Sequence, residues 1–279
     1  SLLLTARTME TLIALYNYPS QFEYVSKETP MTHWMYPVVI GAIYMTTILG
    51  LRAIMSRMAN RIEARWFAAV HNWNMFAISV ACFLGITYGT FKLAFYHGLD
   101  GLICDTNRVS AGKGTLYFWI YVFYLSKFYE LLDTVFIVLR KAPLRFLHFY
   151  HHSMTFFLCW VCLEYAIPVQ WIATSLNAFV HIPMYWYYFI VVVRPKQNIW
   201  WKKYITTIQI VQFVIVLITH SSAVLYHHTY AKNCRSYEGY GNLFAGLVIW
   251  SYLYLFIDFY RATYKSDSPV RRRTTAKDD

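Results

Sequence analysis

Three histidines within five residues, His148, His151 and His152, are the side chains of this sequence best suited to chemistry. On a helix, residues three and four apart share a face, so the three imidazoles point into one sector. Imidazole acts as a base, a nucleophile or a metal ligand near neutral pH. Because polar side chains at membrane depth are costly and usually face a protein interior, we expect this cluster to line a functional site.

The composition predicts the elements that carry these histidines. Of the 279 residues, 58% are hydrophobic and 14% are charged, whereas a soluble domain carries about 25% charged residues. Several apolar runs reach the ~20 residues that cross a bilayer. The fold class we expect is therefore an all-α membrane protein with seven transmembrane helices. The expected spans are residues 34–55, 66–90, 116–139, 144–166, 169–193, 204–225 and 243–260.

The charge distribution predicts how these spans are oriented. A formal net charge of +11 would suggest nucleic acid binding in a soluble protein, but here most lysines and arginines fall in alternate loops and in the C-terminal tail. The positive-inside rule then places the C-terminus in the cytosol and the N-terminus on the other side. We divide the chain into a non-cytosolic tail with an interfacial helix (1–33), a membrane domain (34–264) and a basic cytosolic tail (265–279).

Two cysteines, Cys104 and Cys234, fall in loops on the expected non-cytosolic side. That compartment permits disulfides, so we predict a bridge between them. Cys159 and Cys162 have a C-x-x-C spacing inside an apolar helix, where a reactive thiolate is not favoured.

Other polar side chains fall at depths that match the histidines. With a rise of ~1.5 Å per residue, Asp133 lies ~10 Å and Glu130 ~15 Å from the cytosolic end of the third span, with Lys127 one turn deeper. The histidines lie ~5–10 Å deep. The set is completed from the fifth and sixth spans by Asn177, His181, Tyr185, Tyr188, Gln209 and Gln212. We therefore expect a buried polar site that opens to the cytosol.

Other interpretations of these residues stay open at this point. The H-x-x-H-H box resembles one box of membrane di-iron desaturases and hydroxylases, but those use about eight histidines, and here only His181 joins the box at a suitable depth. His71 lies near the cytosolic side but is interpreted as isolated. Glu130 and Asp133 would have to complete such a ligand set. Lys127 and Glu130 also fit a structural ion pair. A seven-helix receptor shares the topology but leaves the cytosol-facing polar cluster unexplained.

Five motifs follow one another along four spans and narrow the choice among these interpretations. They are Lys127-x-x-Glu130-x-x-Asp133-Thr134, Leu139-Arg140-Lys141, His148-x-x-His151-His152, Asn177-x-x-x-His181-x-x-Met184-Tyr185-x-Tyr187-Tyr188 and Thr206-x-x-Gln209-x-x-Gln212. Each is weak alone, but in this order they closely resemble the ELO-type fatty acid elongases of the endoplasmic reticulum, the very-long-chain 3-ketoacyl-CoA synthases. The resemblance covers about residues 66–264.

The resemblance implies condensation of a long-chain acyl-CoA with malonyl-CoA to 3-ketoacyl-CoA, carbon dioxide and CoA. It implies that six of the seven helices surround an acyl-chain tunnel and that no cofactor is needed besides the co-substrate malonyl-CoA. The expected location is the endoplasmic reticulum membrane, with a lumenal N-terminus. The reductase and dehydratase of the elongation cycle are the expected protein partners, nucleic acid is not expected, and a homodimer is left open.

No cysteine is well placed as a nucleophile, so we expect an imidazole to attack the thioester: His151, assisted by His181. Asp133 or Glu130 would fix the histidine tautomer, as the third member of a triad does. The expected stabilisers of the oxyanion and the enolate are His148, His152, Asn177 and Gln209. The buried residues expected to bind substrate are Lys127, Asn177, Tyr185, Tyr188, Gln209 and Gln212. The side chains expected to pair with CoA phosphates are Arg140, Lys141, Arg145, Lys202 and Lys203, although positive-inside topology alone also places them there.

Overall fold

The computed structural model describes residues 17–105, 112–230 and 240–265, and every regular element within these ranges is a helix. In chain order the helices are α2 (Met35–Arg57), α3 (Arg65–His97), α4 (Asp100–Ile103), α5 (Gly114–Glu130), α6 (Leu132–Leu139), α7 (Phe146–Glu164), α8 (Gln170–Val193), α9 (Lys202–Thr229), α10 (Tyr240–Tyr260) and the π-helical turn η1 (Arg261–Lys265). The expected all-α class is confirmed. The expected interfacial helix and most of the basic tail lie outside the described residues.

Five helices of the described chain are long and apolar enough to cross a membrane: α2, α3, α8, α9 and α10 with η1. Their outer faces carry large apolar side chains, such as Phe95 at 84% and Trp250 at 62% exposed, whereas the charged Lys127 and Glu130 are each 2% exposed. An apolar exterior around a polar interior is stable in lipid, where exposed charge is costly. These helices therefore fit a multi-pass membrane protein.

The expected third and fourth spans do not join this set. The third is interrupted at Leu131, which separates α5 from α6. The amide of Leu131 donates to the carbonyl of Phe128, and the amide of Thr134 donates to that of Leu131. Bonds over three residues tighten the helix locally. The fourth span, α7, has 19 residues, but its three histidines and Glu164 make it more polar. The expectation of seven spanning helices is thus met, by length and composition, for five.

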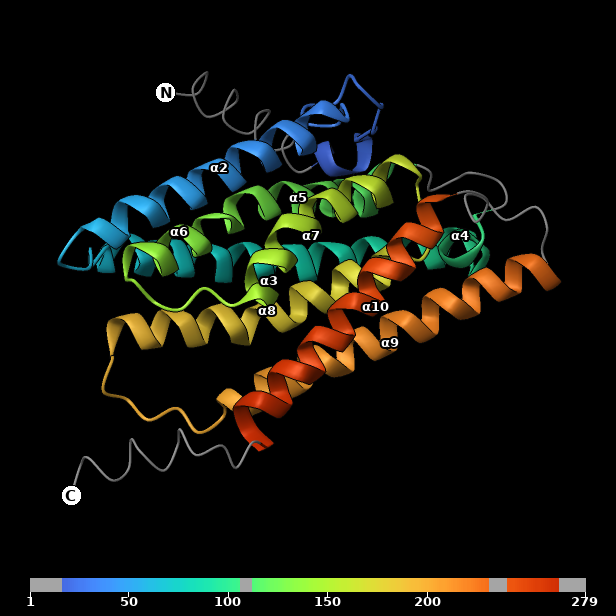
Figure 1. The fold of residues 1–279 in the computed structure, drawn as a ribbon. Coiled ribbons are helices and arrows are strands. Elements are labelled where there is room, and N and C mark those ends of the chain that lie inside the picture. Colours follow the sequence, from blue (N-terminus) through green and yellow to red (C-terminus); the bar gives the residue numbers. More distant parts are fainter. Residues whose placement is uncertain (1–16, 106–111, 231–239, 266–279) are drawn as a thin grey trace, which may run out of the picture.

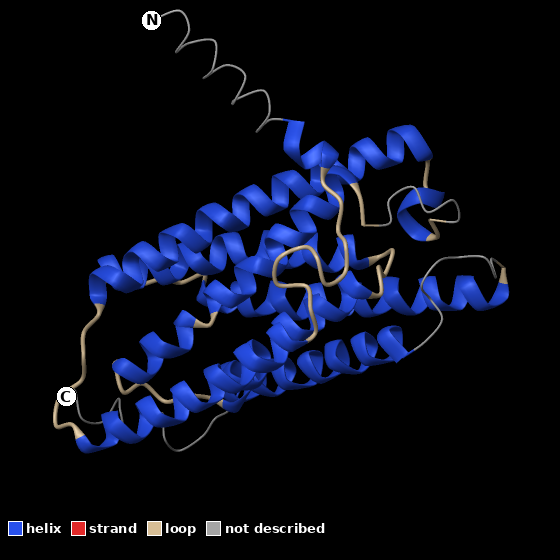
Figure 2. Ribbon diagram, turned by 90° about the horizontal axis from the view of Figure 1, so that it is seen from above, coloured by secondary structure: helices blue, strands red, loops and turns tan. Residues whose placement is uncertain are grey.

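Contacts between the helices close a ring. α3 packs along α8 and α5, α8 packs on α9, α9 on α10, α10 on α7, and α7 on α5. α2 lies against α6 and α7, outside this ring, and most helices run along a common direction (Figures 1 and 2). Where α3 meets α5, a Cβ on Gly89 would lie 2.7 Å from the Leu116 backbone. Small residues permit such close approach between membrane helices.

The loops after α2, α6 and α8 lie at one end of the bundle, near the end of α10 (Figure 1). We call this the basic end, since its loops 58–64, 140–145 and 194–201 carry the lysines and arginines noted above. Two contacts tie it together: the amide of Ile62 donates to the Leu139 carbonyl at 2.9 Å, and Arg65 Nε donates to the Val192 carbonyl at 2.8 Å.

A segment before α2 crosses the opposite end. The indole of Trp160 donates to the carbonyl of Thr32 at 2.6 Å, and the Tyr24 hydroxyl donates to Glu164 Oε2 at 2.9 Å. Burial, together with the nearby Glu164 carboxylate, raises the pKa of Tyr24, so its hydroxyl stays a hydrogen-bond donor. These contacts bind residues 17–34 to α7.

The cysteines divide into two groups. Cys104, in the loop after α4, is disulfide-bonded, while Cys82, Cys159 and Cys162 are free. The predicted partner of Cys104, Cys234, lies outside the described residues, so the predicted pairing itself stays a prediction.

Candidate active site

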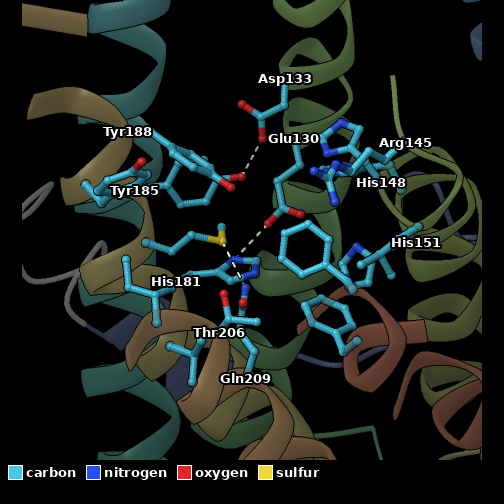
Figure 3. Close-up of a pocket in the computed structure, with 18 of the residues that line it drawn as sticks. Glu130, Asp133, Arg145, His148, His151, His181, Tyr185, Tyr188, Thr206 and Gln209 are labelled. Atoms are coloured by element: carbon cyan, nitrogen blue, oxygen red, sulfur yellow. Dashed lines mark hydrogen bonds and ion pairs between the residues drawn. The ribbon is translucent and has the colours of Figure 1, made fainter. Parts of the chain in front are cut away.

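A cavity of about 270 Å³ opens near the basic end, lined by α5, α6, α7, α8, α9, α10 and η1. Figure 3 shows its polar side chains converging from different helices. All six residues predicted to be catalytic line it: Glu130, Asp133, His148, His151, His152 and His181. So do six of the predicted substrate-binding residues, Asn177, Tyr185, Tyr188, Lys202, Gln209 and Gln212, whereas Lys127 does not. Residues chosen from helical spacing and depth therefore line one common cavity.

Glu130, the last residue of α5, is the centre of a buried network that we call the Glu130 cluster: Lys127, Glu130, Asn177 and His181. Its Oε1 accepts from Lys127 Nζ at 2.6 Å and lies 3.1 Å from Nδ1 of His181. The same lysine donates to Asn177 Oδ1 at 3.1 Å. Glu130 is therefore the carboxylate that orients a histidine of the cavity, which the sequence left undecided between Glu130 and Asp133.

Asp133 belongs to a different network, the Asp133 cluster: His71, Asp133 and Tyr185. Oδ1 of Asp133 lies 3.0 Å from Nε2 of His71, and Oδ2 accepts from the Tyr185 hydroxyl at 2.7 Å. His71 comes from α3, is 2% exposed, and its Nδ1 has no hydrogen-bond partner among the described residues. From its depth near the basic end alone, His71 looked isolated. That interpretation was wrong, because its partner is on another helix.

The histidines of α7 have different partners. Nε2 of His148 lies 2.9 Å from Thr134 Oγ1, which lies 2.8 Å from the hydroxyl of Tyr44 on α2. The His148 and His152 rings are 4.2 Å apart between centroids. His151 packs against Tyr252 of α10, 4.8 Å between centroids. Tyr44 was missed as a site residue because it lies on a helix with no motif, and Thr134, although part of the first motif, was given no role.

The amides of the cavity are fixed to different degrees. Lys127 donates to the oxygen of Asn177, which identifies the orientation of that amide and leaves its NH₂ group to face elsewhere. Gln209 Nε2 contacts the Met184 sulfur at 3.4 Å. Asn177 is thus the amide whose donor is best oriented.

The predicted phosphate-binding residues separate into two sets. Arg145 and Lys202 line the cavity, and the Arg145 guanidinium lies over the Phe259 ring at 4.7 Å. Arg140, Lys141 and Lys203 do not line it. Lys141 instead donates to the carbonyl of Met58 at the end of α2, which is a capping role. Lys203 lies over the Tyr260 ring at 5.8 Å.

A second cavity of about 80 Å³ continues from the first and is called here the deep cavity. The two share four lining residues: His151, Asn177, Gln212 and Phe213. The other lining residues are mostly apolar and include Leu158, Ala173, Val216 and Ile249, with Cys159 and Cys162 among them. Among the described residues no cysteine lines the first cavity, and no group of three His, Cys, Asp or Glu side chains is placed to hold a metal ion.

Known proteins are similar to this chain over most of its length. Residues 29–272 match the model of the ELO family, described as GNS1/SUR4. The chain is 38% identical over 256 residues to fatty acid elongase A of Dictyostelium discoideum, covering 91% of this chain and 92% of that protein. It is 38% identical over 258 residues to putative fatty acid elongase 1 of Schizosaccharomyces pombe, covering 88% and 74%. With very long chain fatty acid elongase 2 of Mus musculus the identity is 36% over 195 residues, covering 67% and 63%. The chain that brings these histidines, carboxylates and amides into one membrane cavity therefore belongs to the ELO family of fatty acid elongases.

Proposed function

We propose that this protein is a very-long-chain 3-oxoacyl-CoA synthase that condenses a long-chain acyl-CoA with malonyl-CoA through an acyl-histidine intermediate on His151. The observation that carries the proposal is a single cavity that receives both His151 and His181, with Glu130 on Nδ1 of His181 (Figure 3). The relatives of this chain are fatty acid elongases. The specific reaction, condensation through an acyl-histidine, is inferred from the geometry of the cavity.

The first step is transfer of the acyl group to the enzyme. A ring nitrogen of His151 attacks the thioester carbonyl, so that a C–N bond forms and the C–S bond breaks. His181 takes the proton of the attacking imidazole and returns it to the CoA thiolate that leaves. With Nδ1–H of His181 donated to Glu130, the lone pair of His181 is on Nε2, which suits a base.

Asn177 stabilises the oxyanion that forms in this step. Its oxygen is held by Lys127, so the NH₂ group is the end of the amide that faces the two cavities it lines. A donor fixed before the reaction stabilises developing charge without reorganising. Gln209, His148 and His152 are the further candidates around the same position.

The second step uses malonyl-CoA. Its C–C bond to the carboxylate breaks, carbon dioxide leaves, and the electron pair remains as an enolate. The enolate carbon attacks the acyl carbon, a C–C bond forms, and the C–N bond to His151 breaks. One proton from solvent, carried by His181, restores the neutral imidazole. No metal ion or organic cofactor is required by this sequence of steps.

The two cavities suit the two parts of an acyl-CoA. The apolar deep cavity would hold the acyl chain within the ring of α3, α8, α9, α10, α7 and α5, while Arg145 and Lys202 near the mouth would pair with CoA phosphates. We place the protein in the endoplasmic reticulum membrane with a cytosolic basic end. A reductase and a dehydratase would then act on the 3-keto product.

The test is incorporation of radiolabelled malonyl-CoA into acyl-CoA by the pure protein, with mass spectrometry of the protein after incubation with acyl-CoA alone. We expect an acyl adduct on His151, and loss of both adduct and product in His151→Ala. His220→Ala is the matched control, since His220 lines neither cavity and bonds the Asn242 carbonyl at 3.2 Å. Full activity of His151→Ala, or loss of activity on chelation, would overturn the proposal.

A further inference from the structure

The far end of the deep cavity contains a buried amide with unused hydrogen-bonding capacity. Gln170 begins α8, is 5% exposed and lines the deep cavity. Its Nε2 donates to the Tyr117 hydroxyl at 3.2 Å, while its Oε1 meets no hydrogen-bond donor among the described residues. A buried polar atom without a partner is disfavoured, so this position suits a ligand that supplies one.

Gln170 lies in the part of the deep cavity that is remote from the histidines along α8. It precedes His181 by eleven residues on α8, or ~16 Å along the helix axis. The walls between them are mostly apolar. The hydroxyl of Thr174 lies on this path but donates to the Gln170 carbonyl at 3.0 Å, and that of Thr155 donates to the His151 carbonyl at 2.6 Å. Both hydroxyl groups therefore already donate hydrogen bonds to backbone carbonyls.

The ligand group that best satisfies the hydrogen-bonding capacity of Gln170 is a hydroxyl. A methyl group at the chain terminus leaves Oε1 of Gln170 without a hydrogen-bond donor and displaces water that would otherwise solvate it. A hydroxyl both donates and accepts, so it pairs with the amide oxygen, and equally with the NH₂ group if the amide is turned by 180°. A site that pairs with a ligand hydroxyl discriminates against the analogue that lacks it.

We propose that Gln170 binds the terminal hydroxyl of an ω-hydroxyacyl chain, and that the enzyme elongates such chains in preference to methyl-ended chains of the same length. This proposal rests on the proposed condensing function, since it assumes an acyl group at His151. The preference has a second signature: it is largest at the single chain length whose terminus reaches Gln170, and it vanishes for shorter chains.

The experiment measures kcat/KM with malonyl-CoA for matched pairs of ω-hydroxyacyl-CoA and plain acyl-CoA over a series of chain lengths. We expect the wild-type protein to prefer the hydroxylated chain by about tenfold at one length. Equal values at every length overturn this inference while leaving the condensing function intact. If neither chain is elongated, it is the condensing function that fails.

Two variants with the same chemical change locate the effect. Gln170→Leu is expected to abolish the preference and to accept the methyl-ended chain at least as well as the wild-type protein. Gln212→Leu removes an amide that lines both cavities beside His151, so it should slow both substrates alike and keep their ratio. A preference that survives in Gln170→Leu, or disappears in Gln212→Leu, contradicts the assignment.

Discussion

Glu130 and Asp133 lie three residues apart, yet the clusters around them differ in chemistry. Glu130 is paired with a buried ammonium group and directly touches a histidine of the cavity. Asp133 is held by a histidine from α3 and a tyrosine hydroxyl. The Glu130 cluster contains two opposite formal charges in a medium that disfavours charge, whereas the Asp133 cluster holds the hydroxyl of Tyr185 beside the cavity. We infer that the Glu130 cluster takes part in the reaction and that the Asp133 cluster positions the side chains around it.

The two carboxylates differ because they lie one helical turn apart, at the junction of α5 and α6. Glu130 ends α5, and Asp133 lies in the first turn of α6. On the neighbouring α8 their partners His181 and Tyr185 are also one turn apart. Of the two carboxylates, it is Asp133 that also meets a side chain of α3, His71. One turn of displacement thus gives the two carboxylates two sets of partners.

The largest effect is expected when the charges of the Glu130 cluster are unbalanced. Lys127→Met keeps much of the side-chain volume but leaves Glu130 buried without its ammonium partner, which should cost about 3–5 kcal/mol of stability and abolish condensation. Thermal unfolding in detergent and malonyl-CoA incorporation measure the two effects.

The control for this variant removes both charges. Lys127→Met/Glu130→Leu should recover most of the lost stability, since replacing a whole buried pair by apolar groups is often tolerated. Activity should not return, because His181 has lost its orienting carboxylate. An unfolding midpoint that is the same in Lys127→Met and the wild-type protein would show that the pair contributes little.

A smaller effect is expected from the Asp133 cluster. Asp133→Asn keeps the shape, but its NH₂ group faces a donor on Tyr185 or His71 that previously met an acceptor. Loss of hydrogen bonds to a charged group should lower kcat about 10- to 100-fold, with less destabilisation than in Lys127→Met. Single-turnover measurement of His151 acylation and of condensation would separate the two steps. An Asp133→Asn protein as inactive as His151→Ala would place Asp133 in the reaction itself.

The sequence was sufficient to identify most of the polar residues of the cavity and insufficient to identify their hydrogen-bond partners. His151, Asn177 and Gln209 could be assigned to one chamber because helical rise converts distance along the chain into depth. Pairing depends on rotation about the helix axis and on which helices are neighbours. Neither is set by spacing within a helix. This is why the choice between Glu130 and Asp133 stayed open and why Tyr44, on a helix without a motif, was missed.

Depth within the membrane was also insufficient to interpret His71, because its partner Asp133 is distant in sequence. His71 is six residues into α3, ~9 Å from the basic end, which matches the ~10 Å of Asp133. That match was the available signal, but only the packing of α3 beside the α5–α6 junction turns it into a contact. The break at Leu131 had no sequence signal, since no proline or glycine marks it.

Removing the outer member of the Asp133 cluster should have a modest effect. His71→Phe retains a ring among Tyr129 and Phe136, whose centroids lie 4.6 and 5.4 Å from that of His71. It removes one of the two donors to Asp133, while Tyr185 remains. We expect kcat to fall about fivefold, measured in the same incorporation assay. If His71→Phe and Asp133→Asn are equally impaired, His71 rather than Tyr185 is the essential partner of the carboxylate.

The smallest effect concerns the relay beside Asp133, from Tyr44 through Thr134 to His148. Tyr44→Phe removes one neutral hydrogen bond and leaves Thr134 bonded to His148, so turnover should fall only about two- to threefold. Tyr36→Phe, the same change on an exposed tyrosine of α2, is the matched control and should have no effect. Thr134→Val breaks both links and should be worse than Tyr44→Phe. Equal rates in all three variants would mean that α2 and the relay merely pack against α6 and α7, and that His148 is oriented by its 4.2 Å contact with His152 instead.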